Sequence, residues 1–306
     1  MRLKDLTFHS QSITAKKMGF ADRLFKETCS LILKILRFMN STALFLSLNA
    51  ALVVLFSFCV YGHRIAPEIV LAAFLVTLSI YSLNKATDRV EDSVNSPKIA
   101  SRSQVYYVTV SVAAMLACFS IGALDGLKVL LVLSMPFVIG LVYSVRVVKT
   151  LPRLKEITGV KNLAVALSWA VTGALLPDAL KTVEFQKVIF VFAFIFIQVM
   201  VKEVIFDFLD MRGDKVSGVT TIPMVLGKRR TRLFLVLMNT FSGLLVMFSI
   251  LSGLIIHFES VSIVGVLFSF LIIWLFIDSN RKRFHSELMV DGKWIPLAEL
   301  IKAILR

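Results

Sequence analysis

The sequence predicts an all-α integral membrane protein with eight to nine transmembrane helices. Hydrophobic residues make up 57% of the 306-residue chain, and its mean hydropathy of +0.83 is too high for a soluble domain of this size. Apolar runs of about 17–25 residues, the length needed to cross a bilayer, recur along the chain with short polar breaks. Basic residues fill one set of alternate breaks and are nearly absent from the other set, which supports the same number of spans.

The expected spans follow one another closely. The apolar runs lie at 41–62, 66–83, 105–124, 127–144, 162–178, 185–203, 233–255 and 260–278. Residues 22–37 mix Leu, Ile and Phe with Lys and Arg at helical spacing, which is typical of an interfacial helix. Residues 294–306 are apolar but short, and they predict either the start of a ninth span or another interfacial helix. We therefore divide the chain into a cytoplasmic N-terminal segment with an interfacial helix, 1–40, and a polytopic transmembrane domain, 41–306.

Positively charged residues predict the orientation of the spans and limit the expected partners. Of the 34 Lys and Arg residues, 30 fall on one side of the predicted membrane, and the other side holds only Arg64, Lys128, Lys181 and Lys187. By the positive-inside rule, the basic side faces the cytoplasm. The net charge of +14 favours a lipid bilayer or an anionic substrate as partner. Nucleic acid is excluded as a partner because the basic residues lie in short loops and form no binding module.

Two clusters of acidic residues interrupt the apolar pattern on the basic side. The first cluster, after the second span, is Asn84, Asp88 and Asp92, and the second cluster, after the sixth span, is Asp207, Asp210 and Asp214. At about 100° per residue, each trio falls within roughly 60–80° on one helix face. Ionisable side chains beside hydrocarbon are costly and usually functional. Hard oxygen ligands suit Mg²⁺, which binds through one or two carboxylates together with substrate phosphates, so the two clusters predict a diphosphate held between them.

The chemistry of an allylic diphosphate accounts for a site at the membrane face. Its ionisation is dominated by charge separation, and metal ions that bridge the diphosphate neutralise the leaving group. The isoprenoid tail would stay in an apolar tunnel while the diphosphate meets the polar loops. Basic side chains that could complete the diphosphate site are Lys98, Arg102, Arg146, Lys149, Lys155, Lys161, Lys202 and Arg212.

Other polar residues near the expected site have both functional and purely structural interpretations. Tyr143 ends the fourth span, where it could stabilise a cation, orient an acceptor, or belong to an interfacial aromatic belt. Asn162 and Ser168 lie at or inside the fifth span, where they could contact an acceptor or form hydrogen bonds between helices.

These motifs resemble those of the UbiA superfamily of intramembrane prenyltransferases. The pattern N-x-x-x-D-x-x-x-D at 84–92 matches the first motif, and DFLDMRGDKVSGVTTIPMVLG at 207–227 is the most specific part of the resemblance. Three further segments are similar to that family: LVYS, LPRLKEITGVKNL and ELMVDGKW. The similarity begins near residue 35 and covers nearly all of the chain after it. The sequence departs from many members after Asn84, because Lys85 replaces an aspartate and NSPKIASRS replaces an R-P-x-x-x-G stretch.

The resemblance implies nine helices in a ring around a central cavity that opens laterally to lipid. It implies that the two motifs bind Mg²⁺ and a polyprenyl diphosphate on the cytoplasmic side, so the metal ligands would be Asn84, Asp88, Asp92, Asp207, Asp210 and Asp214. We assign catalytic roles to Asp88, Asp92, Asp210, Asp214 and Tyr143. We assign substrate contacts to Asn84, Lys98, Arg102, Arg146, Lys149, Lys161, Asn162 and Lys202, with Lys149 matched to a basic contact in the loop after the fourth helix.

The activity that the resemblance implies is Mg²⁺-dependent transfer of a polyprenyl group to a small lipid-soluble acceptor, with release of diphosphate. An aromatic acid or a quinone precursor is the favoured acceptor. A glycerophosphate, a tetrapyrrole or a sugar phosphate is compatible with the same diphosphate site, and so is terpene cyclisation. A secondary transporter would also place carboxylates within apolar helices, but it would tend to hold them near the middle of the bilayer.

Overall fold

The described part of the protein is helical, as the sequence predicts. The computed structural model describes residues 24, 25, 27, 28, 30–32, 34–95, 103–146, 150–255, 259–277 and 290–291. Within these residues there is no strand, and eight helices are long and apolar enough to cross a membrane. The predicted class of all-α membrane protein is therefore confirmed. The candidate ninth span at 294–306 lies outside the described residues.

Each expected apolar run overlaps one of the eight spans. The spans are α2 (Leu44–Tyr61), α3 (Pro67–Thr87), α6 (Gln104–Asp125), α7 (Leu127–Ser144), the segment Val160–Leu180, α10 (Phe185–Val216), α11 (Ile222–Leu251) and α12 (Glu259–Ile277). The largest differences from the sequence prediction are at the end of α10 and the start of α11. Hydropathy marks only the part of a helix that lies in hydrocarbon, whereas these two helices continue through charged sequence. α10 ends where Gly218 takes a φ of +74°, which a residue with a side chain rarely adopts.

The span Val160–Leu180 is irregular in its middle. It consists of α8 (Val160–Ala170), a π-helical turn (Val171–Leu175) and α9 (Leu176–Leu180). Pro177 lies at the start of α9, and a proline inside a span removes one helical hydrogen bond, so a π turn beside it is an expected accommodation. The hydroxyl of Tyr61 donates a hydrogen bond to the Ala174 carbonyl at 2.9 Å, which holds this turn against α2.

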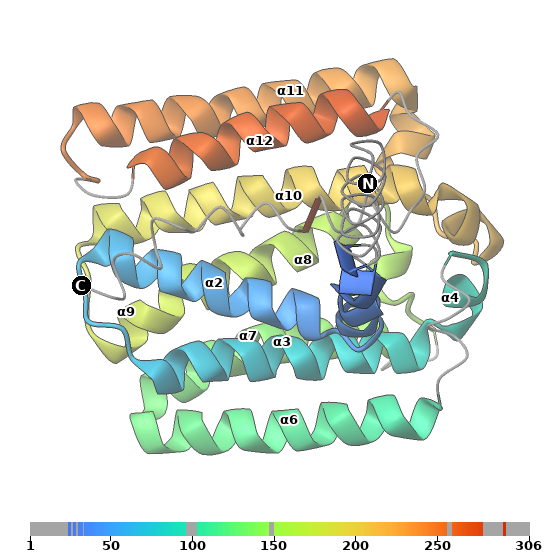
Figure 1. Ribbon diagram of the computed structural model, residues 1–306, viewed down its shortest axis with the longest axis horizontal. Coiled ribbons are helices and arrows are strands. Elements are labelled where there is room, and N and C mark those ends of the chain that lie inside the picture. Colours follow the sequence, from blue (N-terminus) through green and yellow to red (C-terminus); the bar gives the residue numbers. More distant parts are fainter. Residues whose placement is uncertain are drawn as a thin grey trace, which may run out of the picture. The chain divides into compact units, whose positions relative to one another are not determined.

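Contacts between the described helices from α3 to α12 build one bundle. Figure 1 shows the long helices α3, α6, α10, α11 and α12 running nearly parallel, and α3 packs along α6 and α7 while α10 packs along α8 and α11. In the α3–α6 interface the hydroxyls of Ser79 and Ser111 each donate to the other residue's carbonyl at 2.9 Å. Small polar residues allow such close approach between membrane helices.

A second polar contact joins α10, α11 and α12. The buried amide of Gln198 donates hydrogen bonds to Asn239 Oδ1 at 3.1 Å and to Ser242 Oγ at 3.0 Å. Its carbonyl oxygen accepts a hydrogen bond from Ser269 Oγ at 2.7 Å. Because the membrane core offers no water to these groups, their mutual hydrogen bonds fix the register of the three helices.

The contacts divide the chain into two compact units, Met1–Phe45 and Leu46–Arg306. In the first unit, the described residues of the expected interfacial helix at 22–37 are helical. The predicted division at residues 40 and 41 remains a prediction. All candidate functional residues lie in the second unit.

Candidate functional site

The first acidic cluster lies where α3 ends. α3 stops at Thr87, Asp88 follows with φ −96° and ψ 26°, and α4 (Arg89–Asn95) begins immediately afterwards. Hydrogen bonds of helical spacing nevertheless continue through this bend, from Asp88 N to Asn84 O and from Asp92 N to Asp88 O, both at 2.9 Å. Asn84, Asp88 and Asp92 therefore keep the four-residue spacing that the sequence predicted, although the helix bends at the middle residue.

Basic side chains from another part of the chain meet Asp88. This carboxylate is buried, with 8% of its surface exposed, and Lys155 Nζ forms a short hydrogen bond with its Oδ1 atom. A guanidinium nitrogen of Arg153 lies 3.9 Å from the same oxygen, and Thr87 Oγ1 donates a hydrogen bond to it at 3.2 Å. One positive charge in direct contact and a second nearby offset much of the cost of burying the carboxylate.

The second acidic cluster lies on the last three turns of α10, which is one continuous helix from Phe185 to Val216. Lys161 Nζ lies 3.1 Å from Asp207 Oδ1 and 3.2 Å from Asp214 Oδ2. Asn162 Nδ2 donates a hydrogen bond to the other carboxylate oxygen of Asp207 at 2.9 Å. A single lysine thus pairs with two of the three carboxylates of the cluster.

One short segment, residues 153–162, connects the two clusters. It contains a turn of 3₁₀ helix (Leu154–Glu156) and the start of α8, where Gly159 has a φ of +79°. This segment delivers Lys155 to the first cluster and Lys161 to the second cluster. α4 also packs against α10, so the clusters lie on neighbouring elements on either side of the segment.

Tyr143 lies in the last turn of α7, the helix that ends beside the first cluster. Its neighbour Ser144 donates a hydrogen bond to Asn84 Oδ1 at 3.3 Å, which ties α7 to the first cluster. The catalytic role assigned to Tyr143 stays a prediction.

A second polar layer lies deeper in the span region. The indole nitrogen of Trp169 donates a hydrogen bond to the Tyr81 hydroxyl at 3.1 Å, and Lys202 Nζ lies 4.7 Å from the centre of the Trp169 ring. At 1.5 Å per residue, these side chains lie about 7–10 Å along their helices from the acidic residues and the first turn of α8. They therefore form an aromatic and charged layer one to two helical turns below the two clusters.

The ion pairs of Lys202 lie outside the second cluster, and its predicted contact with substrate stays a prediction. Lys202 pairs with Glu203 at 3.2 Å and with Asp291 at 3.3 Å. Five residues along a helix correspond to a rotation of about 140°, so Lys202 leaves α10 from a different face than Asp207. Lys202 is close to the acidic residues in the sequence, but its side chain leaves the helix in a different direction.

Four other basic residues were predicted to contact the substrate. Arg146 pairs with Glu156 through two 3.0 Å contacts at the end of α7, rather than with an aspartate of either cluster. Burial alone would raise the pKa of Glu156, but hydrogen bonds from Arg153 and Arg146 hold it below its usual value. Lys98, Arg102 and Lys149 lie outside the described residues.

The chemistry of the second cluster fits a hard divalent cation. Among the residues that the structure describes, no three His, Cys, Asp or Glu side chains converge closely enough to hold a metal ion by themselves. Mg²⁺ needs only one or two carboxylates when substrate phosphates complete its coordination. The buried Oδ1 atom of Asn162, beside Asp207, has no hydrogen-bond partner in the described structure, and it is an oxygen ligand of the required type.

Sequence reasoning missed several residues that the fold brings to this region. Arg153 is one basic residue among several in its loop, and only the contact with Asp88 distinguishes it. Tyr81 and Trp169 were not singled out from the sequence, because nothing in the spacing links two residues 88 positions apart. Asp291 belongs to the segment ELMVDGKW that carried part of the resemblance, and that segment was the available signal.

Comparisons with known proteins agree on one family and one fold. The model of the UbiA prenyltransferase family matches residues 50–289. A UbiA homologue from Archaeoglobus fulgidus, solved with GPP and Mg²⁺, superposes with a TM-score of 0.67 at 16% identity, over 88% of this chain and 99% of that one. The apo form of a UbiA homologue from Aeropyrum pernix K1 gives a TM-score of 0.64 at 15% identity, over 85% and 98%.

A third solved structure comes from a study of digeranylgeranylglyceryl phosphate synthase. It superposes with a TM-score of 0.59 at 15% identity, over 90% of this chain and 98% of that one. A search of curated proteins found no sequence that matches the chain.

Proposed function

Because the chain belongs to the UbiA prenyltransferase family, we propose that it transfers a polyprenyl group from a polyprenyl diphosphate to a small lipid-soluble acceptor, releasing diphosphate. Its eight apolar helices make it a multi-pass membrane protein. The observation that carries the proposal is the short segment 153–162, which places one lysine at each of the two acidic clusters.

The donor site would lie between the clusters. Its proposed metal ligands are Asn84, Asp88 and Asp92 on one side and Asp207, Asp210 and Asp214 on the other. Solved UbiA homologues from Archaeoglobus fulgidus hold GPP or DMAPP together with Mg²⁺, which supports this assignment. Bound Mg²⁺ would neutralise charge on the leaving diphosphate.

The chain's own basic groups would assist departure of the diphosphate. Lys155 and Lys161 hold ammonium groups at the acidic residues, beside the place where diphosphate oxygens would bind. As the carbon–oxygen bond of the allylic diphosphate breaks, negative charge grows on the diphosphate, and these fixed positive charges stabilise it. Lys98, Arg102 and Lys149 are proposed further contacts from neighbouring loops.

The acceptor would meet the allylic cation in the deeper polar layer. Tyr143 and the layer formed by Tyr81 and Trp169 offer aromatic faces that stabilise positive charge. Asn162 could orient either substrate, since it lies in the first turn of α8 beside Asp207. A carbon or oxygen nucleophile of the acceptor forms the new bond with the prenyl carbon and loses one proton, so the products are prenylated acceptor, diphosphate and H⁺.

Two classes of acceptor are proposed. An aromatic acid or quinone precursor comes first, on the family resemblance described above. A glycerophosphate lipid is the second candidate, supported by the structural similarity to digeranylgeranylglyceryl phosphate synthase. The active site would face the cytoplasm, because the clusters lie on the side that carries most Lys and Arg residues.

Binding of the prenyl diphosphate tests the donor site without knowledge of the acceptor. Thermal unfolding of the purified full chain in detergent would be followed with geranylgeranyl diphosphate, with and without Mg²⁺. The wild-type protein should be stabilised only when both are present, and Asp210→Asn should weaken the apparent affinity at least about 10-fold, the effect of losing one charged contact. Asp178→Asn is the matched control, because Asp178 accepts a hydrogen bond from Val183 N at 2.8 Å in the loop between α9 and α10. An Asp210→Asn response equal to wild type would contradict the proposal.

A further inference from the structure

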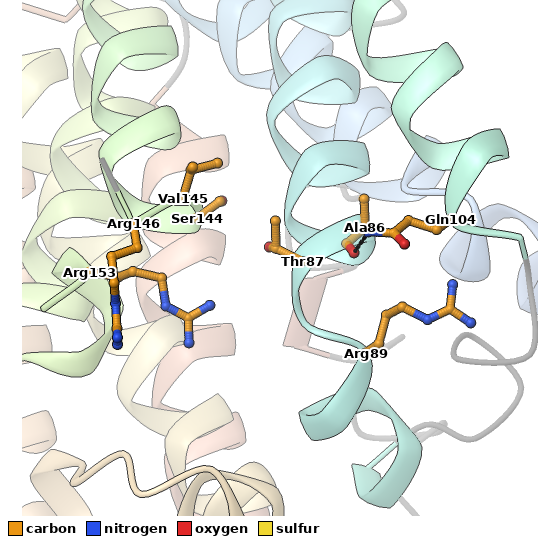
Figure 2. A pocket seen from close by; sticks show the side chains of 8 residues that line it. All are labelled: Ala86, Thr87, Arg89, Gln104, Ser144, Val145, Arg146 and Arg153. Carbon is orange, nitrogen blue, oxygen red and sulfur yellow. Dashed lines mark hydrogen bonds between the residues drawn. The ribbon is translucent and has the colours of Figure 1, made fainter. Parts of the chain in front are cut away.

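A pocket of about 420 Å³ opens where α3, α6 and α7 end on the basic side of the protein. Its lining residues come from the ends of these three helices and from the segments that follow them: Ala86, Thr87, Arg89, Gln104, Ser144, Val145, Arg146 and Arg153. Figure 2 shows Arg146 and Arg153 on one side of the pocket and Thr87, Arg89 and Gln104 on the other. None of the acidic residues of the two clusters lines the pocket, but it adjoins the first cluster, because Thr87 and Arg153 lie against Asp88 and Ser144 contacts Asn84.

The lining is strongly positive. It contains three arginines and no carboxylate. Glu156, just outside the lining, holds two of the arginines in place, with Arg146 at 3.0 Å and Arg153 at 2.8 Å from its carboxylate oxygens. Two guanidinium groups fixed by one carboxylate keep a net positive charge, and guanidinium groups match the oxygens of a phosphate in geometry.

The pocket lies at the depth of lipid headgroups. The spans α3, α6 and α7 have their ends at Thr87, Gln104 and Ser144, and each of these three residues lines the pocket. A phosphate bound there would sit level with the ends of the apolar helices, where the bilayer changes from hydrocarbon to headgroups.

Apolar side chains lead away from the pocket along both outer helices. On α6, Val108 and Val112 follow Gln104 at four-residue intervals and are 42% and 45% exposed. On α7, Leu141 and Val138 precede Val145 by four and seven residues and are 37% and 54% exposed. Residues at these intervals share a helix face, so each helix continues the pocket as a strip of hydrocarbon surface toward the middle of the membrane.

We propose that this pocket binds the phosphate of an anionic phospholipid, whose acyl chains lie along the exposed faces of α6 and α7. Basic pockets between membrane helices on the cytoplasmic side are suited to such headgroups. Free diphosphate carries the same phosphate groups. It could bind to the arginines, but it would not contact the apolar strips. The lipid is favoured because the strips begin at the pocket itself.

Lipid binding by the full chain in nanodiscs tests the proposal independently of any prenyltransferase activity. The protein would be reconstituted in nanodiscs of phosphatidylcholine with a minor fraction of phosphatidylglycerol. After gentle release of the protein from the nanodisc, the lipids that stay bound to it would be measured by native mass spectrometry. The wild-type protein should retain phosphatidylglycerol in preference to phosphatidylcholine. Arg89→Gln combined with Arg146→Gln should lower this preference about 30-fold, since each interfacial arginine contributes about a 5-fold effect.

The matched control is Arg229→Gln combined with Arg230→Gln, which removes the same charge from exposed positions near the start of α11. This control should retain phosphatidylglycerol like the wild type. An equal loss in both double variants would show attraction by net charge alone and would overturn the proposal. Should the pocket double variant unfold, Arg89→Gln by itself carries the test with an expected 5-fold loss, because it leaves both arginine contacts of Glu156 in place.

Free diphosphate distinguishes the two sources of phosphate. Retained phosphatidylglycerol should resist displacement by millimolar diphosphate, because the acyl chains contribute to binding. Complete displacement, or binding of diphosphate with no preference among lipids, would assign the pocket to a soluble anion and overturn the lipid proposal.

Discussion

Replacing Lys161 with methionine should strongly destabilise the protein. Methionine keeps most of the apolar stem of the lysine but removes the ammonium group that lies 3.1 Å from Asp207 and 3.2 Å from Asp214. The side chains of both aspartates are almost fully buried, at 1% and 5% exposed. Removing one partner of a buried ion pair costs about 3–5 kcal/mol, because the remaining charge is left in a medium of low polarity.

This free energy corresponds to a measurable change in melting temperature. The unfolding entropy of a chain of this length is about 0.6 kcal/mol/K, so the melting temperature of Lys161→Met in detergent should fall by roughly 5–8 °C. The matched control is Lys187→Met. Lys187 pairs at 3.4 Å with Glu184, whose side chain is 70% exposed, so this change should lower the melting temperature by less than about 2 °C.

The same variant tests whether the second cluster binds a divalent cation. With the ammonium group gone, Mg²⁺ together with a prenyl diphosphate should stabilise Lys161→Met by neutralising the buried carboxylates of Asp207 and Asp214, and it should recover part of the lost melting temperature. A variant that melts like Lys187→Met would refute the account of the ion pair. No recovery with Mg²⁺ and prenyl diphosphate would count against the metal assignment.

Three other changes have defined outcomes. Gly140→Ala should lower stability by about 1–2 kcal/mol in thermal unfolding, because an added Cβ would lie 2.6 Å from an isoleucine side chain of α3, whereas Gly243→Ala meets its nearest atom at 3.4 Å and should be close to neutral. Gln198→Leu should cost about 2 kcal/mol by removing three hydrogen bonds between α10, α11 and α12, with prenyl diphosphate binding unchanged. Tyr81→Phe removes the acceptor of the Trp169 indole hydrogen bond and should raise KM for the acceptor several-fold more than KM for the prenyl diphosphate; an equal rise in both would remove the deeper layer from the acceptor site.

The spans could be predicted from the sequence because burial in hydrocarbon imposes a direct requirement on composition. Eight apolar runs of sufficient length correspond to eight helices in the described part of the chain, and the orientation predicted from the basic loops stays a prediction. The ends of helices were less predictable. α11 begins at Ile222, well before the expected run at 233–255. A short helical stretch precedes a kink at Gly227, where φ is +71° and ψ is 166°, and the charged sequence KRRTR after the kink is helical without being apolar.

The acidic residues were predictable, and Lys155, Lys161 and Asn162 were among the candidates beside them, but which side chain pairs with which carboxylate was not. Spacing along a helix reveals which carboxylates share a face, as for Asp207 and Asp214. It does not reveal which of many loop lysines folds back onto them, since that depends on the path of the segment 153–162. Arg146 illustrates the limit, because the chain leaves the helix at Val145 with φ −110° and ψ 137°, and this extended residue directs the arginine into the pocket beside Glu156.

The most direct test of the central claim is release of diphosphate by the purified protein. Geranylgeranyl diphosphate and Mg²⁺ would be supplied with a panel of acceptors comprising aromatic acids, quinone precursors and glycerophosphate lipids. We expect release that depends on one acceptor class, stops in excess chelator, and falls at least about 100-fold in both Asp88→Asn and Asp210→Asn, the effect of losing transition-state contacts worth about 3 kcal/mol. Full activity in either variant, or undiminished activity without divalent cations, would contradict a diphosphate held between the two acidic clusters.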